Sequence, residues 1–123
     1  MAKILVIDDE KEICLLLQKI LEKDGHQVLI LIDPVKGLEI VRKEKPDCVL
    51  LDLKMPNMDG IETLDAIKKI DKNVGVIMIT GHGDVENAME SMKLGAYDYI
   101  AKPFDVDFIL SLTKRYLKSK KAA

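Results

Sequence analysis

Long hydrophobic runs are missing from this sequence. The longest wholly apolar runs contain only a few of the 123 residues, so no segment is long enough to span a bilayer. The chain also does not open with the charged and apolar pattern of a signal peptide. We therefore expect a cytoplasmic protein with no membrane partner.

A charge excess of one sign is also lacking. The 19 lysines and arginines nearly balance the 21 aspartates and glutamates, leaving a formal net charge of −2. This balance gives no electrostatic reason to expect direct nucleic acid binding by this chain, although a DNA-binding domain could be joined to it. With 48% hydrophobic and 33% charged residues, the composition is that of one ordinary globular domain.

Cysteine and histidine are scarce. The two cysteines, Cys14 and Cys48, stand within apolar segments, which is typical of buried and reduced thiols. With His26 and His82 as the only histidines, a zinc site is not expected. His82 lies between two glycines, and we interpret it as a loop residue without a catalytic role.

What the sequence does contain is a regular alternation of strand and helix patterns. Five short apolar runs predict buried strands at 3–8, 27–32, 48–53, 74–80 and 97–100. Helical spacing of apolar residues follows each run, over about 13–25, 34–46, 60–70, 84–95 and 105–118. The alternation predicts an α/β fold, a doubly wound five-stranded parallel sheet with five helices on its two faces. We expect one domain over residues 1–119, and a basic tail or linker stub at 120–123.

Within these elements, several residues have a predicted local role. Gly25 is expected to end the first helix, and Asp33 and Asp105 are expected to cap helices. Gly60 is interpreted as a turn residue with positive φ. In the fourth helix, the Met89/Met92 stripe is expected to lie in the core.

The most reactive residues follow the carboxyl ends of the predicted strands. Asp8 and Asp9 end the first strand, Asp52 the third and Thr80 the fourth, while Lys102 follows the fifth. In an open α/β sheet these ends meet at one edge, where ligands bind. Three carboxylates in one place repel each other unless a cation shares the space. Mg²⁺, completed by waters and phosphate oxygens, and the Lys102 ammonium group both suit that role.

A carboxylate in such surroundings can act as a nucleophile toward phosphorus and form an acyl phosphate. Asp52, central in the sheet, is best placed to do so. Taken singly, Asp52 could instead cap the next turn, Thr80 could be an ordinary strand-end residue, and Lys102 could be a solvated surface lysine. Glu10 is expected to act only at a helix N-terminus, where a carboxylate suits the helix dipole.

Four motifs, in order, resemble the receiver domain of two-component response regulators. They are the acidic pair Asp8-Asp9, Asp52 in LLDLKMPNMDG, Thr80 in MITGHGD, and Lys102-Pro103 in YDYIAKPF. The resemblance extends from Lys3 to about Lys118. It implies a flavodoxin-like fold, as in chemotaxis regulators, with strand order 2-1-3-4-5. The loops look most like those of receivers in transcriptional activators that carry an ATPase domain.

The resemblance also implies the metal site and the phosphoacceptor. Asp52 would accept the phosphoryl group. Mg²⁺ would be bound by Asp8, Asp9, Asp52 and the backbone carbonyl of Lys54.

Further roles follow from the same resemblance. Thr80 would hydrogen-bond the phosphoryl group and Lys102 would pair with it, and the Lys102–Pro103 peptide bond would be cis. Tyr99 would swing into the space that Thr80 leaves.

The function implied is a phosphorylation switch. A histidine kinase or phosphotransfer protein would donate the phosphoryl group. The face formed by 84–95, 97–100 and 105–118 would then change, to control a partner protein or an attached output domain, with a homodimer through this face as one form of output. Apart from its own phosphoryl transfer and slow dephosphorylation, the chain would not be an enzyme. Whether it is a complete regulator or part of a longer one is left open.

Two other classes fit the residues less well. Hydrolases resembling the haloacid dehalogenases need a second aspartate two residues after the nucleophile, where this chain has Lys54. A flavodoxin-like cofactor binder would need a phosphate loop rich in glycine and hydroxyl groups after the first strand. This chain has DDEKE there, and acidic residues would repel a flavin phosphate.

Overall fold

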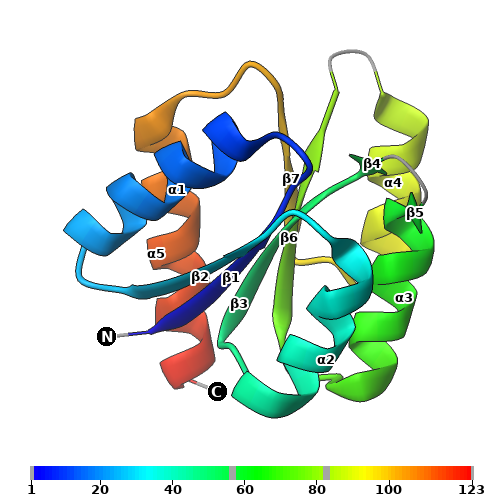
Figure 1. Cartoon of the computed structure of the whole chain (residues 1–123), viewed down its shortest axis with the longest axis horizontal. Coiled ribbons are helices and arrows are strands. Elements are labelled where there is room, and N and C mark those ends of the chain that lie inside the picture. Colours follow the sequence, from blue (N-terminus) through cyan, green and yellow to red (C-terminus); the bar gives the residue numbers. More distant parts are fainter. Residues whose placement is uncertain (1, 56–57, 82–83, 123) are drawn as a thin grey trace.

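A computed structural model describes residues 2–55, 58–81 and 84–122, and five parallel strands form its central sheet (Figure 1). The strands are β1 (Lys3–Ile7), β2 (Gln27–Leu31), β3 (Cys48–Asp52), β6 (Gly75–Thr80) and β7 (Asp98–Ala101). Their spatial order is β2-β1-β3-β6-β7. Counted along the chain, this is the predicted order 2-1-3-4-5, so the fold prediction is confirmed.

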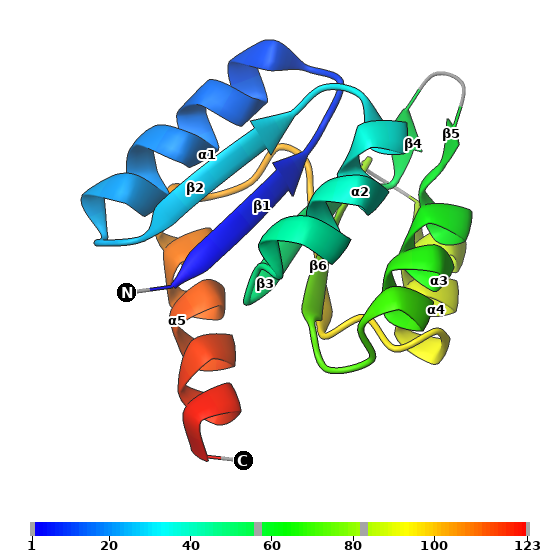
Figure 2. The same cartoon turned by 60° about the horizontal axis from the view of Figure 1, so that its bottom comes forward.

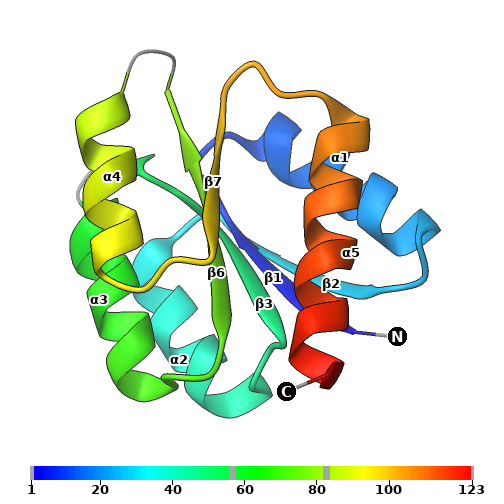
Figure 3. The ribbon, with the colours of Figure 1, turned by 180° about the vertical axis from the view of Figure 1, so that it is seen from behind.

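Five helices cover the two faces of the sheet. They are α1 (Lys11–Lys23), α2 (Pro34–Glu44), α3 (Gly60–Ile70), α4 (Val85–Lys93) and α5 (Val106–Ala122). Helices α1 and α5 lie on one face, while α2, α3 and α4 lie on the other (Figures 2 and 3). None of the helices in the described residues combines the length and apolar character that crossing a bilayer requires.

Each central strand contributes side chains to two hydrophobic cores, one on each face of the sheet. In β1, Ile4 and Val6 belong to the core under α1 and α5, whereas Leu5 and Ile7 belong to the core under α2 and α3. All four side chains are fully buried. Alternate residues of a strand point to opposite faces, which explains why a strand covered on both sides is apolar at every position.

The ends of the helices agree with the sequence in most places. The Asp33 carboxylate accepts a hydrogen bond from the Val35 amide at 3.0 Å, and Asp105 accepts one from the Asp107 amide at 2.8 Å. Gly25 follows α1 with a φ of +94°, a left-handed conformation that favours glycine. These three predicted helix ends are confirmed.

The prediction for Gly60 is wrong. Gly60 is the first residue of α3 and does not have a positive φ. Its amide donates a hydrogen bond of 3.0 Å to the Leu53 carbonyl, and a Cβ atom at this position would lie 2.6 Å from the Leu53 Cα. Glycine is needed here because the start of α3 lies directly on the backbone that follows β3.

The exposed side of α4 also differs from the prediction. Ala88 is buried, but Met89 and Met92 are 57% and 40% exposed. Only a narrow stripe of this helix contacts the sheet. The helical spacing of apolar residues predicted the helix correctly, but the prediction that Met89 and Met92 lie in the core is wrong. Two methionines on the surface make part of this face apolar.

A short antiparallel hairpin, not predicted, follows β3. It consists of β4 (Lys54–Met55) and β5 (Met58–Asp59). Two residues per strand are too few to show a periodic pattern. Pro56 and Asn57, interpreted as turn residues, lie outside the described residues.

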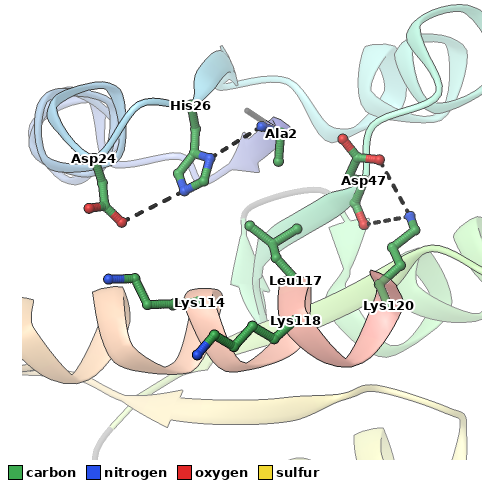
Figure 4. A pocket seen from close by; sticks show the side chains of 8 residues that line it. All are labelled: Ala2, Asp24, His26, Asp47, Lys114, Leu117, Lys118 and Lys120. Atoms are coloured by element: carbon green, nitrogen blue, oxygen red, sulfur yellow. Dashed lines mark hydrogen bonds and ion pairs between the residues drawn. The ribbon is translucent and has the colours of Figure 1, made fainter. Parts of the chain in front are cut away.

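Helix α5 continues past its predicted end near Lys118 to Ala122. Lys120 donates a hydrogen bond of 3.1 Å to the Asp47 carbonyl, and its ammonium group lies 3.6 Å from the Asp47 carboxylate (Figure 4). This tertiary contact holds the last turn against the start of β3. A pocket of about 510 Å³ lies beside it, lined in part by His26 and Leu117, at the amino-terminal end of the sheet.

Candidate functional site

The predicted reactive residues lie together at the opposite, carboxyl-terminal end of the sheet. Asp8 and Asp9 directly follow β1, Asp52 ends β3, and Thr80 ends β6. Lys102 follows β7, whose last residue, Ala101, is in register with Thr80. The parallel pairing of neighbouring strands is therefore what assembles residues that are up to 94 positions apart, from Asp8 to Lys102.

Four carboxylates converge at this edge. Asp8, Asp9, Glu10 and Asp52 each offer an oxygen, and these atoms all lie within 4.8 Å of one another. Asp8 and Asp52 are buried, whereas Asp9 and Glu10 are more accessible. The cluster thus has a buried floor and an open rim.

The ammonium group of Lys102 enters this cluster. Its Nζ lies 3.4 Å from Asp8 Oδ2, 3.6 Å from Asp52 Oδ2 and 2.8 Å from Glu10 Oε1. Burial by itself lowers the pKa of Lys102, but the hydrogen bond to Glu10 and the charges of Asp52 and Asp8 outweigh that effect and raise the pKa. Lys102 is therefore fully charged at neutral pH.

The surroundings of Asp8 suit a further cation. Its Oδ1 accepts a hydrogen bond of 2.9 Å from the Glu10 amide. Its Oδ2 is buried and has no hydrogen-bond partner among the described residues. Burial raises the pKa of Asp8, against the lowering effects of the Glu10 amide and of Lys102. A buried carboxylate oxygen that makes no hydrogen bond, and whose cationic neighbour is Lys102 at 3.4 Å, fits the oxygen coordination of a hard divalent cation.

Thr80 and Tyr99 lie on the two strands next to this cluster. Thr80 is buried, and its hydroxyl donates a long hydrogen bond of 3.5 Å to the Ile100 carbonyl. Tyr99 is 38% exposed on β7. The Lys102–Pro103 peptide bond is cis, the isomer that the resemblance implied. Lys54 lies in β4, two residues beyond Asp52.

Two features of the site were not found from the sequence. Glu10 was expected to serve only the N-terminus of α1, but it forms an ion pair with Lys102. Cys14, expected only to be buried, donates a hydrogen bond of 3.3 Å from its thiol to the Asp8 carbonyl. Neither contact could be predicted from a sequence pattern, because each depends on the side-chain conformation in the folded chain. His82 lies outside the described residues.

Known proteins resemble this chain over nearly its whole length. Residues 4–114 match the response regulator receiver domain family. Sporulation initiation phosphotransferase F of Bacillus subtilis is 46% identical over 118 residues, which cover 96% of this chain and 95% of that protein. The crystal structure of a response regulator receiver domain protein from Clostridium thermocellum has a TM-score of 0.94 and 40% identity, covering 99% of this chain and 98% of that one.

Longer regulators resemble it as well. Nitrogen assimilation regulatory protein NtrX of Azorhizobium caulinodans is 39% identical over 118 residues, 94% of this chain but only 26% of that protein. The chain therefore matches nearly the full length of one relative and about a quarter of another. The motifs, the strand order and these relatives agree: the chain belongs to the receiver domains of two-component response regulators and is a signalling switch.

Proposed function

We propose that this receiver accepts a phosphoryl group on Asp52 from a sensor histidine kinase or a phosphotransfer protein, with Mg²⁺ as cofactor. The observation that carries the proposal is the position of Asp52. Its carboxylate is buried at the end of the central strand β3, within a cluster of acidic side chains and 3.6 Å from the Lys102 ammonium group.

The chemistry required of Asp52 is a single displacement at phosphorus. A carboxylate oxygen of Asp52 forms the new O–P bond while the bond from phosphorus to the donor's nitrogen or oxygen breaks, and the donor leaves with that electron pair. The product is an acyl phosphate on Asp52. Lys102, whose Nζ lies 3.6 Å from Asp52 Oδ2, would pair with the negative oxygens of the transferred group.

Asp8, Asp9, Asp52 and the backbone carbonyl of Lys54 would hold Mg²⁺. When bound, the ion supplies positive charge that neutralises the carboxylates and the phosphoryl oxygens. The Oδ2 atom of Asp8, which is buried and makes no hydrogen bond among the described residues, supports this assignment. Lys102 alone supplies one positive charge to a cluster of four acidic residues.

Phosphorylation would then act through Thr80 and Tyr99. Its added negative charge would draw the Thr80 hydroxyl toward Asp52, and Tyr99 would move into the space released. Met89, Met92 and Tyr99 expose apolar surface on α4 and β7, next to α5. This α4-β7-α5 face is where a partner protein, an attached output domain or a second copy would bind.

The remaining assignments follow from the family. Residues 1–119 would carry the receiver function. In a longer regulator, a linker to an output domain would continue from 120–123, which include the last residues of α5. The chain would act in the cytoplasm without binding nucleic acid itself. Its only catalysis would be its own phosphorylation and slow dephosphorylation.

Mass spectrometry of the intact protein tests the proposal. After incubation with acetyl phosphate, the wild-type chain should gain the mass of one phosphoryl group only when Mg²⁺ is present. Asp52→Ala should gain none. Asp65→Ala is the matched control, because Asp65 pairs with Lys69 on the outer side of α3 and should not affect labelling. Labelling of Asp52→Ala at the normal rate would refute the assignment.

A further inference from the structure

Glu10 makes the shortest contact of Lys102 in the site. The Lys102 Nζ atom lies 2.8 Å from Glu10 Oε1, compared with 3.4 Å from Asp8 Oδ2 and 3.6 Å from Asp52 Oδ2. Only the first distance is that of a charge-assisted hydrogen bond. The resting position of Lys102 is therefore set by a residue that is neither the proposed phosphoacceptor nor one of the proposed metal ligands.

The backbone of Glu10 is fixed, while its side chain is directed to Lys102. The Glu10 amide donates to the Asp8 carboxylate, and the Glu10 carbonyl accepts a hydrogen bond of 3.1 Å from the Cys14 amide. Glu10 is the N-cap residue of α1, but its side chain makes no capping hydrogen bond. The helix end thus explains the position of Glu10 and does not explain the direction of its carboxylate.

The ion pair links Lys102 to the rim of the site. The Glu10 side chain is 57% exposed, whereas those of Asp8 and Asp52 are 0% and 6% exposed. A phosphoryl group on Asp52 would attract Lys102 inward, toward the buried floor. Lys102 would have to weaken or give up its bond to Glu10 to form that contact.

We propose that Glu10 is a positioning residue that holds Lys102 at the rim in the unphosphorylated chain and so slows phosphorylation of Asp52. The inference rests on the proposed function of Asp52 as phosphoacceptor. Ion pairs with an exposed partner contribute little, so releasing Lys102 should change the rate by a factor of up to about five.

Two substitutions of Glu10 distinguish the effect of its ion pair with Lys102 from the effect of a negative charge at this position. Glu10→Gln removes the charge, while Glu10→Asp keeps it on a side chain one methylene shorter, which draws the carboxylate back from Lys102. The matched control is Glu12→Gln, the same charge change at an exposed position in the first turn of α1. Labelling by acetyl phosphate at saturating Mg²⁺ should be about two- to fivefold faster in both Glu10 variants and unchanged in the control.

A second measurement follows Lys102 directly. In NMR spectra of the unphosphorylated chain, the Lys102 Cε resonance should shift in both Glu10 variants. The shift should be toward its position in wild-type protein bound to fluoroberyllate, a stable analogue of the phosphoryl group. A purely structural role at the end of α1 would not produce this shift.

Several results would overturn the inference. Acceleration in Glu10→Gln with wild-type behaviour in Glu10→Asp would mean that only the charge matters. Slower labelling in both would mean that Glu10 assists the chemistry or binds the metal. Normal labelling and an unshifted Lys102 resonance in both Glu10 variants would refute the inference. The proposal that Asp52 is the phosphoacceptor would then still stand. A wild-type chain that takes up no phosphoryl group from any donor would instead refute the proposed function, and the inference with it.

Discussion

The hydroxyl of Thr80, at the end of β6, donates a hydrogen bond of 3.5 Å to the carbonyl oxygen of Ile100 in β7. This bond is long for a hydroxyl donor, and its acceptor is neutral. A phosphoryl oxygen on Asp52 would be a charged and therefore stronger acceptor. Thr80 can thus exchange a weak contact for a strong one, which makes it suited to transmit phosphorylation to β7.

Replacing Thr80 with alanine should leave labelling of Asp52 largely intact and weaken the switch. Loss of one hydrogen bond to a charged group costs about 1.5–3 kcal/mol. A full shift from 1:99 to 99:1 requires about 5.5 kcal/mol, so the variant would reach only a partial shift. The measurement is the NMR change at Tyr99 on adding fluoroberyllate. Thr80→Ser, which keeps the hydroxyl, is the control, and a full response in Thr80→Ala would refute the coupling.

Mg²⁺ should stabilise the folded chain. A ligand that binds only the folded state, present at ten times its Kd, adds about 1.4 kcal/mol to the free energy of unfolding. Urea unfolding with Mg²⁺ and with a chelator measures this difference. Asp8→Asn should remove most of it, because the Asp8 carboxylate is a proposed ligand and its buried Oδ2 makes no hydrogen bond among the described residues. Asp65→Asn should retain it, and an equal gain in Asp8→Asn would contradict the metal assignment.

Gly60→Ala should destabilise the chain by about 1–3 kcal/mol, although alanine is the better helix former. The added Cβ would lie 2.6 Å from Leu53 Cα and 2.7 Å from its carbonyl carbon, and backbone atoms cannot turn aside as a side chain can. Gly81→Ala is the control, since no described atom lies within 4 Å of the corresponding Cβ position. Chemical denaturation measures the free energy of unfolding of both variants. Equal values would show that α3 can move away from Leu53 at no cost in stability.

The strands were predictable because burial on both faces requires apolar residues at successive positions, whereas their order was implied by the family resemblance. Leu5 and Val6 point to opposite cores, so both must be apolar, and this produces the continuous apolar runs. Once the strands are parallel, Asp52 and Lys102 must reach the same edge. The general location of the site therefore follows from pattern and topology alone.

What could not be predicted depends on contacts between distant side chains. The Glu10–Lys102 ion pair joins residues 92 positions apart, and neither residue type at its position requires it. The last turn of α5 depends on Lys120 reaching Asp47. Gly60 looked like a turn glycine because the close approach of Leu53 is visible only in three dimensions.

Stability should fall with rising pH above about 9. Burial raises the pKa of the Cys48 thiol from 9.0 to about 12, and burial also raises the pKa of Cys14 to about 11 and of Tyr116 to about 12. In the folded chain these groups keep their protons, whereas the unfolded chain begins to lose them near pH 9 to 10. The unfolded state is then favoured, and each group contributes up to about 1.4 kcal/mol per pH unit between its two pKa values.

Cys48→Ala provides the test of this pH dependence. The substitution should lower stability at pH 8, because it leaves a small cavity in the core. Between pH 9 and 11 its free energy of unfolding should fall less steeply than that of the wild type, by about one proton equivalent, or 1.4 kcal/mol per pH unit. Urea titrations at pH 8, 9, 10 and 11 measure both slopes. Parallel curves would mean that the Cys48 thiol ionises as readily in the folded chain as in the unfolded one.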